Sequence, residues 1–227
     1  MKILSAGAAK GLLQTIGARE GISLDGEFGA VGAIRERLRA GAPCDVVVLT
    51  AAMMAELAAS AEVNASTVVA LGKVHTGVAM LNAEPLAKIN DVQSLKLLLT
   101  QATKLYFPDP SRATAGIHFM KVLTALGLAE SHRERFATYP NGATAMRAMA
   151  DAGDIGAVGI TQCSEILYTD GVRYAGALPS PHELATIYSA AITNRAENVD
   201  EATQFLNAMS SATNEQVRVS AGFEPLA

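Results

Sequence analysis

The sequence predicts an α/β protein whose mainly parallel sheet is divided between two lobes. Short apolar runs rich in β-branched residues alternate with segments of helical periodicity along the whole chain. Half of the 227 residues are hydrophobic and only 18% are charged, which provides enough apolar surface for a sizeable core. The chain is expected to cross between the lobes near Asn82 and again near Tyr188. Residues 1–81 and 190–227 would then form a discontinuous first lobe, with residues 82–189 inserted as the second.

The first lobe is expected to begin with a strand at residues 2–6 and to contain a buried parallel strand at residues 45–49. The second of these strands reads Asp-Val-Val-Val-Leu, a run that is typical of a strand covered on both faces. Residues 26–30, which include two glycines and an alanine, predict a flexible stretch. A strand at residues 187–193 is expected to return the chain to this lobe. Helices are expected at residues 11–19, 31–40, 52–60, 199–210 and 214–220, and Leu12, Leu13 and Ile16 are expected to face inward from the first of them.

The second lobe is expected to contain a central strand at residues 104–107, which stops at a Pro-Asp-Pro sequence. A helix at residues 117–126 follows, because Phe119, Val122 and Leu126 recur at helical spacing and Gly127 stands where a helix ends. Other strands are expected at residues 75–82, 155–160 and 172–175. Other helices are expected at residues 92–100 and 144–152, the second with Met146 and Met149 facing inward at helical spacing. A further short helix is expected to end at residue 167.

The composition argues against two classes of function. The net charge is −4 and there is no basic run, which argues against a nucleic-acid partner. The apolar stretches are far shorter than a membrane span, so no membrane insertion is expected. The two cysteines and the four histidines match no metal-ligand spacing, and no cofactor motif is present, so neither a metal nor a cofactor is expected.

Cys44 and Cys163 both stand in apolar neighbourhoods. Buried thiols are the expected state, and a disulfide between them is the alternative. The amino-terminal residues run directly into the first predicted strand, without the pattern of a secretory signal. A cytoplasmic protein is therefore expected if Met1 is the native start, and a periplasmic one if a signal peptide has been removed.

The turn between the central strand and its helix is the best candidate for binding. Residues 109–116 are small or polar, and they lead into a helix whose first backbone N–H groups lack partners within the helix. These groups and the helix dipole attract anions, and Arg112 adds a forked cation at the same place. The alternative is an ordinary strand-to-helix turn with a solvated arginine.

Four segments, taken together, resemble one family. They are residues 40–47, residues 109–119, residues 153–156 running on to 164–166, and residues 222–225. Their order and spacing resemble the molybdate-binding-protein-like solute-binding proteins, over essentially the whole chain. The resemblance implies a type II periplasmic-binding-protein fold, with a ligand cleft between two α/β lobes that close by a hinge. It also implies a small anionic ligand and, if the protein is exported, an ABC transporter permease as partner.

The loops of this chain differ from those of the molybdate binders. The resemblance implies that the oxyanion in that family is held by serine hydroxyls of the first two loops, by backbone amides and by a tyrosine hydroxyl. Here neither residues 6–10 nor residues 29–33 include a hydroxyl, and the tyrosine position is Thr161 or Gln162. An organic carboxylate or polycarboxylate is therefore expected in preference to molybdate. The expected ligand-binding residues are Ala8, Lys10, Gly32, Ser111, Arg112, Thr114, Gln162 and Ser164.

An isomerase is the alternative function, because aconitate isomerases resemble the wider family. An allylic proton shift on a tricarboxylate would need a cationic cradle and a proton shuttle. His118 and Glu165 are the expected catalytic residues in that case, and His182 is a further candidate. Each has a structural alternative. His118 would be a packed histidine, Glu165 a residue that favours a helix start, and His182 a surface loop residue.

Overall fold

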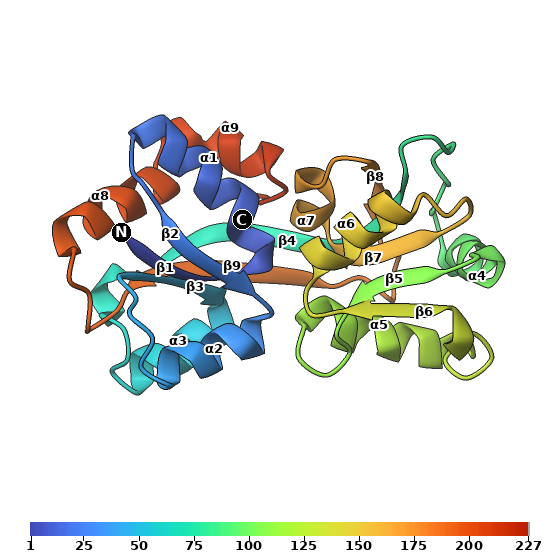
Figure 1. The fold of residues 1–227 in the computed structure, drawn as a ribbon, viewed down its shortest axis with the longest axis horizontal. Coiled ribbons are helices and arrows are strands. Elements are labelled where there is room, and N and C mark those ends of the chain that lie inside the picture. Colours follow the sequence, from blue (N-terminus) through green and yellow to red (C-terminus); the bar gives the residue numbers. More distant parts are fainter. Residues whose placement is uncertain (227) are drawn as a thin grey trace. The chain divides into compact units, whose positions relative to one another are not determined.

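The computed structural model describes residues 1–226 and separates into two compact units (Figure 1). Unit 1 consists of Met1–Val74 and Thr186–Ala227, and unit 2 consists of His75–Ala185. Both boundaries fall inside strands, one in β4 (Val69–Leu81) and one at the start of β9 (Ala185–Ile192). The mixed α/β class expected from the sequence is confirmed. The lobe boundaries expected at residues 81/82 and 189/190 lie a few residues further along the chain than these divisions.

The sheet of unit 1 has the strand order β2-β1-β3-β9. Strands β1 (Lys2–Ala6), β2 (Asp25–Gly29) and β3 (Val46–Thr50) are parallel, and β9 runs antiparallel to β3. Strand β2 corrects the expectation of a flexible stretch at residues 26–30. Its Asp-Gly-Glu-Phe-Gly sequence has weak strand propensity, but every residue pairs in register with β1, from Lys2↔Asp25 to Ala6↔Gly29.

Helices cover both faces of this sheet (Figure 1). α1 contacts α8 and α9 on one face, while α2 and α3 lie on the other. The predicted inward residues of α1, Leu12, Leu13 and Ile16, are fully buried, as are the valines of β3. The helical segments are η1 (Gly7–Ala9), α1 (Lys10–Glu20), α2 (Val31–Arg39), α3 (Ala51–Ala59), η2 (Ala65–Thr67), α8 (Val199–Ser210), η4 (Ala212–Asn214) and α9 (Glu215–Ser220).

The sheet of unit 2 has the strand order β4-β7-β5-β6, and β8 (Val172–Ala177) also pairs with β4. Strands β5 (Leu105–Pro108), β6 (Phe136–Tyr139) and β7 (Val158–Gln162) are parallel, while β4 is antiparallel to β7 and β8. The sequence analysis assigned no strand to β6, which is only four residues long. The helical segments are α4 (Val92–Gln101), α5 (Thr114–Ala125), η3 (Arg133–Arg135), α6 (Gly142–Ala152) and α7 (Cys163–Tyr168).

Two apolar clusters fill unit 2, one on each face of its sheet. On the α5 face, the Phe107 ring meets those of Phe119 and Phe136 edge-on, at 5.1 and 5.4 Å between centroids. On the α6 face, Met146 and Met149 are fully buried, as their helical spacing predicted. These clusters fix α5 and α6 against the strands that precede them.

Helix α5 begins at Thr114, three residues earlier than expected. Gly116 allows this start, because a Cβ atom there would lie 2.2 Å from the carbonyl oxygen of Pro108. The first turn of the helix therefore approaches the end of β5 more closely than any larger residue would permit. At the other end, Gly127 takes φ +74°, and Leu128 donates to the Leu123 carbonyl at 2.8 Å.

The structure confirms that Cys44 and Cys163 are buried thiols without a disulfide. Burial raises the pKa of the Cys44 thiol to about 12. Among residues 1–226, no helix is long and apolar enough to cross a membrane. The same residues contain no cluster of three or more histidine, cysteine or acidic side chains that could hold a metal ion.

Asp45 connects three elements of unit 1 through one buried carboxylate. The carboxylate accepts from the backbone N–H of Lys2 at 2.7 Å and from those of Glu197 and Asn198 at 2.8 and 3.0 Å. The Asn198 side-chain amide donates a fourth bond at 3.0 Å. Burial by itself would raise the pKa of Asp45, but these hydrogen bonds outweigh it and hold that pKa below its ordinary value.

Replacing Asp45 with asparagine should destabilise the protein, because an amide group would then face backbone donors. The expected loss is about 2–3 kcal/mol of unfolding free energy at neutral pH, the scale of charged hydrogen bonds. Urea denaturation measures it, with Asp25→Asn, an exposed carboxylate in the same unit, as the matched control. Because the pKa of Asp45 is lowered in the folded state, the contribution is present above the ordinary aspartate pKa. It is lost as the pH falls through the lowered value, so the two proteins should converge in acid. Equal stability at neutral pH would contradict this role.

Candidate functional site

In unit 1, the parallel strands β1, β2 and β3 end at the same edge of the sheet, and a helical segment follows each one. The Thr50 hydroxyl caps α3 by accepting from the Met53 N–H. The starts of η1 and α2 are different, because Ala6 and Ala30 occupy their cap positions and supply no side-chain cap. Ala8 lies in η1 and Gly32 in the first turn of α2, so both predicted residues belong to these uncapped starts.

Lys10 is the first residue of α1 and lies at this same edge. Its ammonium group stands 5.7 Å from the centroid of the Phe28 ring on β2. The nearest hydroxyl in the sequence, that of Ser5, is fully buried and donates to the Ala6 carbonyl at 2.9 Å. The edge therefore offers an anion backbone N–H groups and one cation, with methyl groups around them.

In unit 2, the ends of β5, β6 and β7 also share one edge, and α5, α6 and α7 follow them. Asn141 caps α6 by accepting from the Thr144 N–H at 2.9 Å. Ala113 occupies the cap position of α5 and supplies no side-chain cap. Thr114, the first residue of α5, is half-buried. The start of α5 thus resembles the starts of η1 and α2, where the cap residue is also an alanine that makes no side-chain hydrogen bond.

The turn before α5 is organised by Asp109. Its carboxylate accepts from the N–H of Ser111 at 2.7 Å and from the Ser111 hydroxyl at 2.6 Å. These bonds, with a smaller contribution from the charge of Arg112, hold the pKa of Asp109 below its ordinary value. The hydroxyl proton of Ser111 is therefore used within the turn. Arg112 is exposed beside it, at the place the sequence analysis indicated.

Buried polar side chains gather where β7 passes into α7. Gln162 and Ser164, both predicted ligand-binding residues, are 3% and 5% exposed. Among the described residues, the Ser164 hydroxyl has no hydrogen-bond partner. Thr76 on β4 was not among the predicted site residues, yet its hydroxyl is also buried and has no hydrogen-bond partner within residues 1–226. Thr76 stands opposite Gln162 in the β4–β7 register, a pairing that no local sequence pattern signals.

Glu165 lies in α7 but serves the start of the neighbouring helix α6. Its carboxylate accepts from the Thr161 hydroxyl at 2.5 Å and from the Ala143 N–H at 3.2 Å, and the amides of Gln162 and Gly142 add further hydrogen bonds. Burial raises the pKa of Glu165, and these bonds offset part of that effect. The contacts of Glu165 therefore fit the structural alternative, that of a residue which favours a helix start. The helix start that it favours is that of α6.

His118 lies on α5, and its Nε2 atom is 2.8 Å from the carbonyl oxygen of His182. This contact ties the middle of α5 to the loop before β9. His182 itself is half-buried, and its N–H donates to the Pro179 carbonyl at 2.7 Å. Both predicted histidines therefore take part in anchoring this loop.

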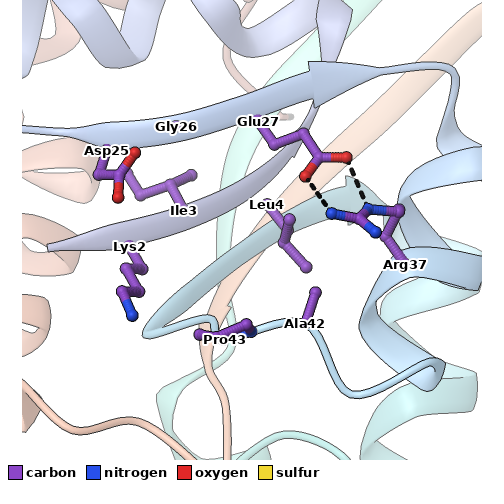
Figure 2. Close-up of a pocket in the computed structure, with 9 residues that line it drawn as sticks. All are labelled: Lys2, Ile3, Leu4, Asp25, Gly26, Glu27, Arg37, Ala42 and Pro43. Carbon is purple, nitrogen blue, oxygen red and sulfur yellow. Dashed lines mark hydrogen bonds and ion pairs between the residues drawn. The ribbon is translucent and has the colours of Figure 1, made fainter.

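A pocket of about 300 Å³ lies at the opposite ends of β1 and β2 from the predicted residues of unit 1 (Figure 2). Figure 2 shows the Glu27 carboxylate joined to the Arg37 guanidinium by two bonds, of 2.8 and 2.9 Å. With Lys2 and Asp25 also in the lining, positive and negative side chains are balanced. The pocket contains none of the predicted ligand-binding residues and does not favour an anion.

Residues 2–224 match the sequence profile of the bacterial extracellular solute-binding proteins. A curated relative, the aconitate isomerase of a Pseudomonas species, is 24% identical over 198 residues, which cover 86% of this chain and 72% of that protein. The periplasmic molybdate-binding protein of Azotobacter vinelandii has the same fold, with a TM-score of 0.80, 19% identity and full coverage of both chains. The sulfate-binding protein SubI of Mycobacterium tuberculosis H37Rv gives a TM-score of 0.70 at 17% identity, over 100% of this chain and 86% of that one.

The contact between Glu165 and α6 can be tested at Gly142. A Cβ atom there would lie 2.0 Å from the Glu165 carboxylate and 1.9 Å from the Thr161 hydroxyl. Gly142→Ala should lower the unfolding free energy by about 2 kcal/mol, because the buried carboxylate must leave its donors. Gly29→Ala is the control, since its Cβ atom would lie an ordinary 3.5 Å from Ile34. Denaturation curves that do not distinguish the two variants would refute the packing described here.

Proposed function

This chain belongs to the bacterial extracellular solute-binding proteins, and we propose that its ligand is a small organic anion, a carboxylate or polycarboxylate rather than molybdate. The observation that carries the proposal is the uncapped start of α5. It lies beside exposed Arg112, at the sheet edge that also holds the unpartnered hydroxyls of Ser164 and Thr76. Backbone N–H groups, a guanidinium fork and neutral hydroxyls together suit a carboxylate.

The loops of unit 1 support the same choice. A tetrahedral oxyanion exposes four oxygens and requires donors on every side. The starts of η1 and α2 offer backbone N–H groups, but Ala6, Ala8 and Ala30 surround them with methyl groups. Such surroundings suit the carbon skeleton of an organic acid better than a bare oxyanion. The molybdate-binding and sulfate-binding neighbours share the fold at less than 20% identity, which does not extend to the ligand.

A thermal-shift panel tests the proposal. Dicarboxylates and tricarboxylates should raise the melting temperature, because a ligand that binds only the folded state stabilises it. Molybdate and tungstate should bind weakly or not at all, since the serine hydroxyls that hold them in the family are missing from both loops of unit 1. Calorimetry supplies the decisive number. Sub-micromolar molybdate binding, roughly 8 kcal/mol or better, would overturn the choice of ligand.

An isomerase acting on a tricarboxylate is the second candidate, favoured by the similarity to an aconitate isomerase. The reaction would move one proton from the methylene carbon to the far carbon of the double bond. Its shuttle would be His118 or Glu165. The contact of His118 with the His182 carbonyl and the cap that Glu165 provides for α6 weigh toward structural roles for both. Incubating the protein with cis-aconitate and recording NMR spectra over time distinguishes the two functions, since a binding protein leaves the cis-aconitate unchanged.

Arg112→Ala should weaken the binding of the best carboxylate in the panel by roughly ten- to a hundredfold. The physical reason is the loss of a charged hydrogen bond, about 1.5–3 kcal/mol. Arg112→Lys should recover only part of the affinity, because a point charge cannot form the bidentate pair. The stability of the ligand-free protein should hardly change, because the side chain is exposed.

Arg133→Ala is the matched control, because Arg133 is an exposed arginine of the same unit, in η3. If Arg112→Ala binds as well as the parent, the arginine is a solvated turn residue. If the variant melts much lower without ligand, Arg112 is structural and the cationic role passes to Lys10.

A further inference from the structure

The contact between Lys10 and Phe28 joins the two uncapped helix starts of unit 1. Lys10 directly follows η1, and Phe28 stands two residues before Ala30, which occupies the cap position of α2. The Lys10 ammonium group lies 5.7 Å from the centroid of the Phe28 ring. Phe28 pairs with Ser5 in the register of β2 with β1, so the ring stands one residue before the ends of both strands. The contact therefore places the cation of α1 over the end of β2, from which the chain passes into α2.

The alternation of side chains along β2 explains why Phe28 meets α1. Glu27 forms its ion pair with Arg37 of α2, so its side chain points to the α2 face of the sheet. Phe28 is the next residue, and its side chain points to the opposite face, where α1 lies. Gly26 shares that face, and a Cβ atom there would lie 2.6 Å from Cε2 and 2.7 Å from Cζ of Phe28. The ring thus occupies the space that a side chain at residue 26 would need, so Gly26 sets where the ring lies.

An aromatic ring is a suitable partner for a cation that must also bind an anion. Attraction to the ring orients the ammonium group but leaves its positive charge in place, whereas a carboxylate partner would neutralise it. Lysine has a flexible four-carbon stem, so an ammonium group that nothing holds loses conformational freedom when a ligand binds. The contact with the half-buried Phe28 ring meets part of that entropic cost before a ligand arrives.

We propose that Phe28 is a positioning residue of the anion site, because its ring holds the Lys10 ammonium group at the edge where η1 and α2 begin. This inference rests on the proposed function, because it requires an organic anion that Lys10 contacts. Phe28 has no polar group and was not among the predicted site residues. Its effect on affinity passes through Lys10, so that effect depends on the charge of Lys10. This dependence distinguishes positioning from ordinary packing.

Calorimetric titration of the whole protein with succinate and with tricarballylate tests the inference. Phe28→Leu keeps an apolar side chain but removes the ring, and it should weaken the binding of both probes by about two- to fivefold, which corresponds to about 0.5–1 kcal/mol. Phe28→Tyr keeps the ring and should bind as the parent does. Lys10→Met should weaken binding more than Phe28→Leu, because it removes the charge itself. In the Lys10→Met protein, Phe28→Leu should have no further effect on affinity, since the ring then has no cation to hold.

A second variant, Gly26→Ala, displaces the ring while leaving Phe28 and Lys10 in place. It should weaken binding in the parent and not in the Lys10→Met protein, and it decides the question if Phe28→Leu does not fold. Lys2→Met is the matched control, because it removes the same charge from the opposite end of β1 and should bind both probes as the parent does.

The inference is overturned if Phe28→Leu binds both probes as tightly as the parent. It is also overturned if Phe28→Leu weakens binding equally with and without the charge of Lys10, which is the result that packing alone would give. Parental affinity in Lys10→Met would overturn it too, while leaving the proposed function intact. A parent that binds neither probe refutes the proposed function and the inference together.

Discussion

A helix that starts at the edge of a sheet must satisfy its first backbone N–H groups, and the architecture of this protein depends on how it does so. In unit 2, the buried carboxylate of Glu165 accepts from the first residues of α6. In unit 1, the buried carboxylate of Asp45 accepts from the backbone of Glu197 and Asn198, which precede α8, and from that of Lys2 in β1. Both acids join segments far apart in the sequence, so their hydrogen bonds help to hold each unit together.

The two carboxylates differ in their electrostatic state. Asp45 receives four donated hydrogen bonds, which outweigh its burial and lower its pKa. In Glu165 burial outweighs the hydrogen bonds, and its pKa is raised. One is therefore a stable ion of the fold. The surroundings of the other disfavour its charged form, at the edge where we propose that an anion binds.

Other helix starts have no side-chain cap from the residue at the cap position. The starts of η1, α2 and α5 all follow an alanine, which supplies no side-chain cap. Nearby hydroxyl groups already donate hydrogen bonds within the protein: Ser5 donates to the Ala6 carbonyl and Ser111 donates to the Asp109 carboxylate. In unit 2, the buried hydroxyls of Ser164 and Thr76 have no hydrogen-bond partner among residues 1–226. His118 and Glu165 both make structural contacts in that unit, which favours holding an organic anion over transferring protons on it.

The sequence by itself determined the α/β class, the buried run of β3, the inward faces of α1 and α6, and the turn before α5. Each of these depends on local periodicity or on residue types that act within one segment. The structure alone revealed β2 and β6, because their weak sequences become strands only by pairing with β1 and β5. The tertiary structure also decided which hydroxyls form hydrogen bonds within the protein and that Thr76 lies opposite Gln162. It likewise placed Glu165 at the start of a helix that begins 23 residues before it. These relations depend on partners far along the chain, and local sequence patterns contain no information about such partners.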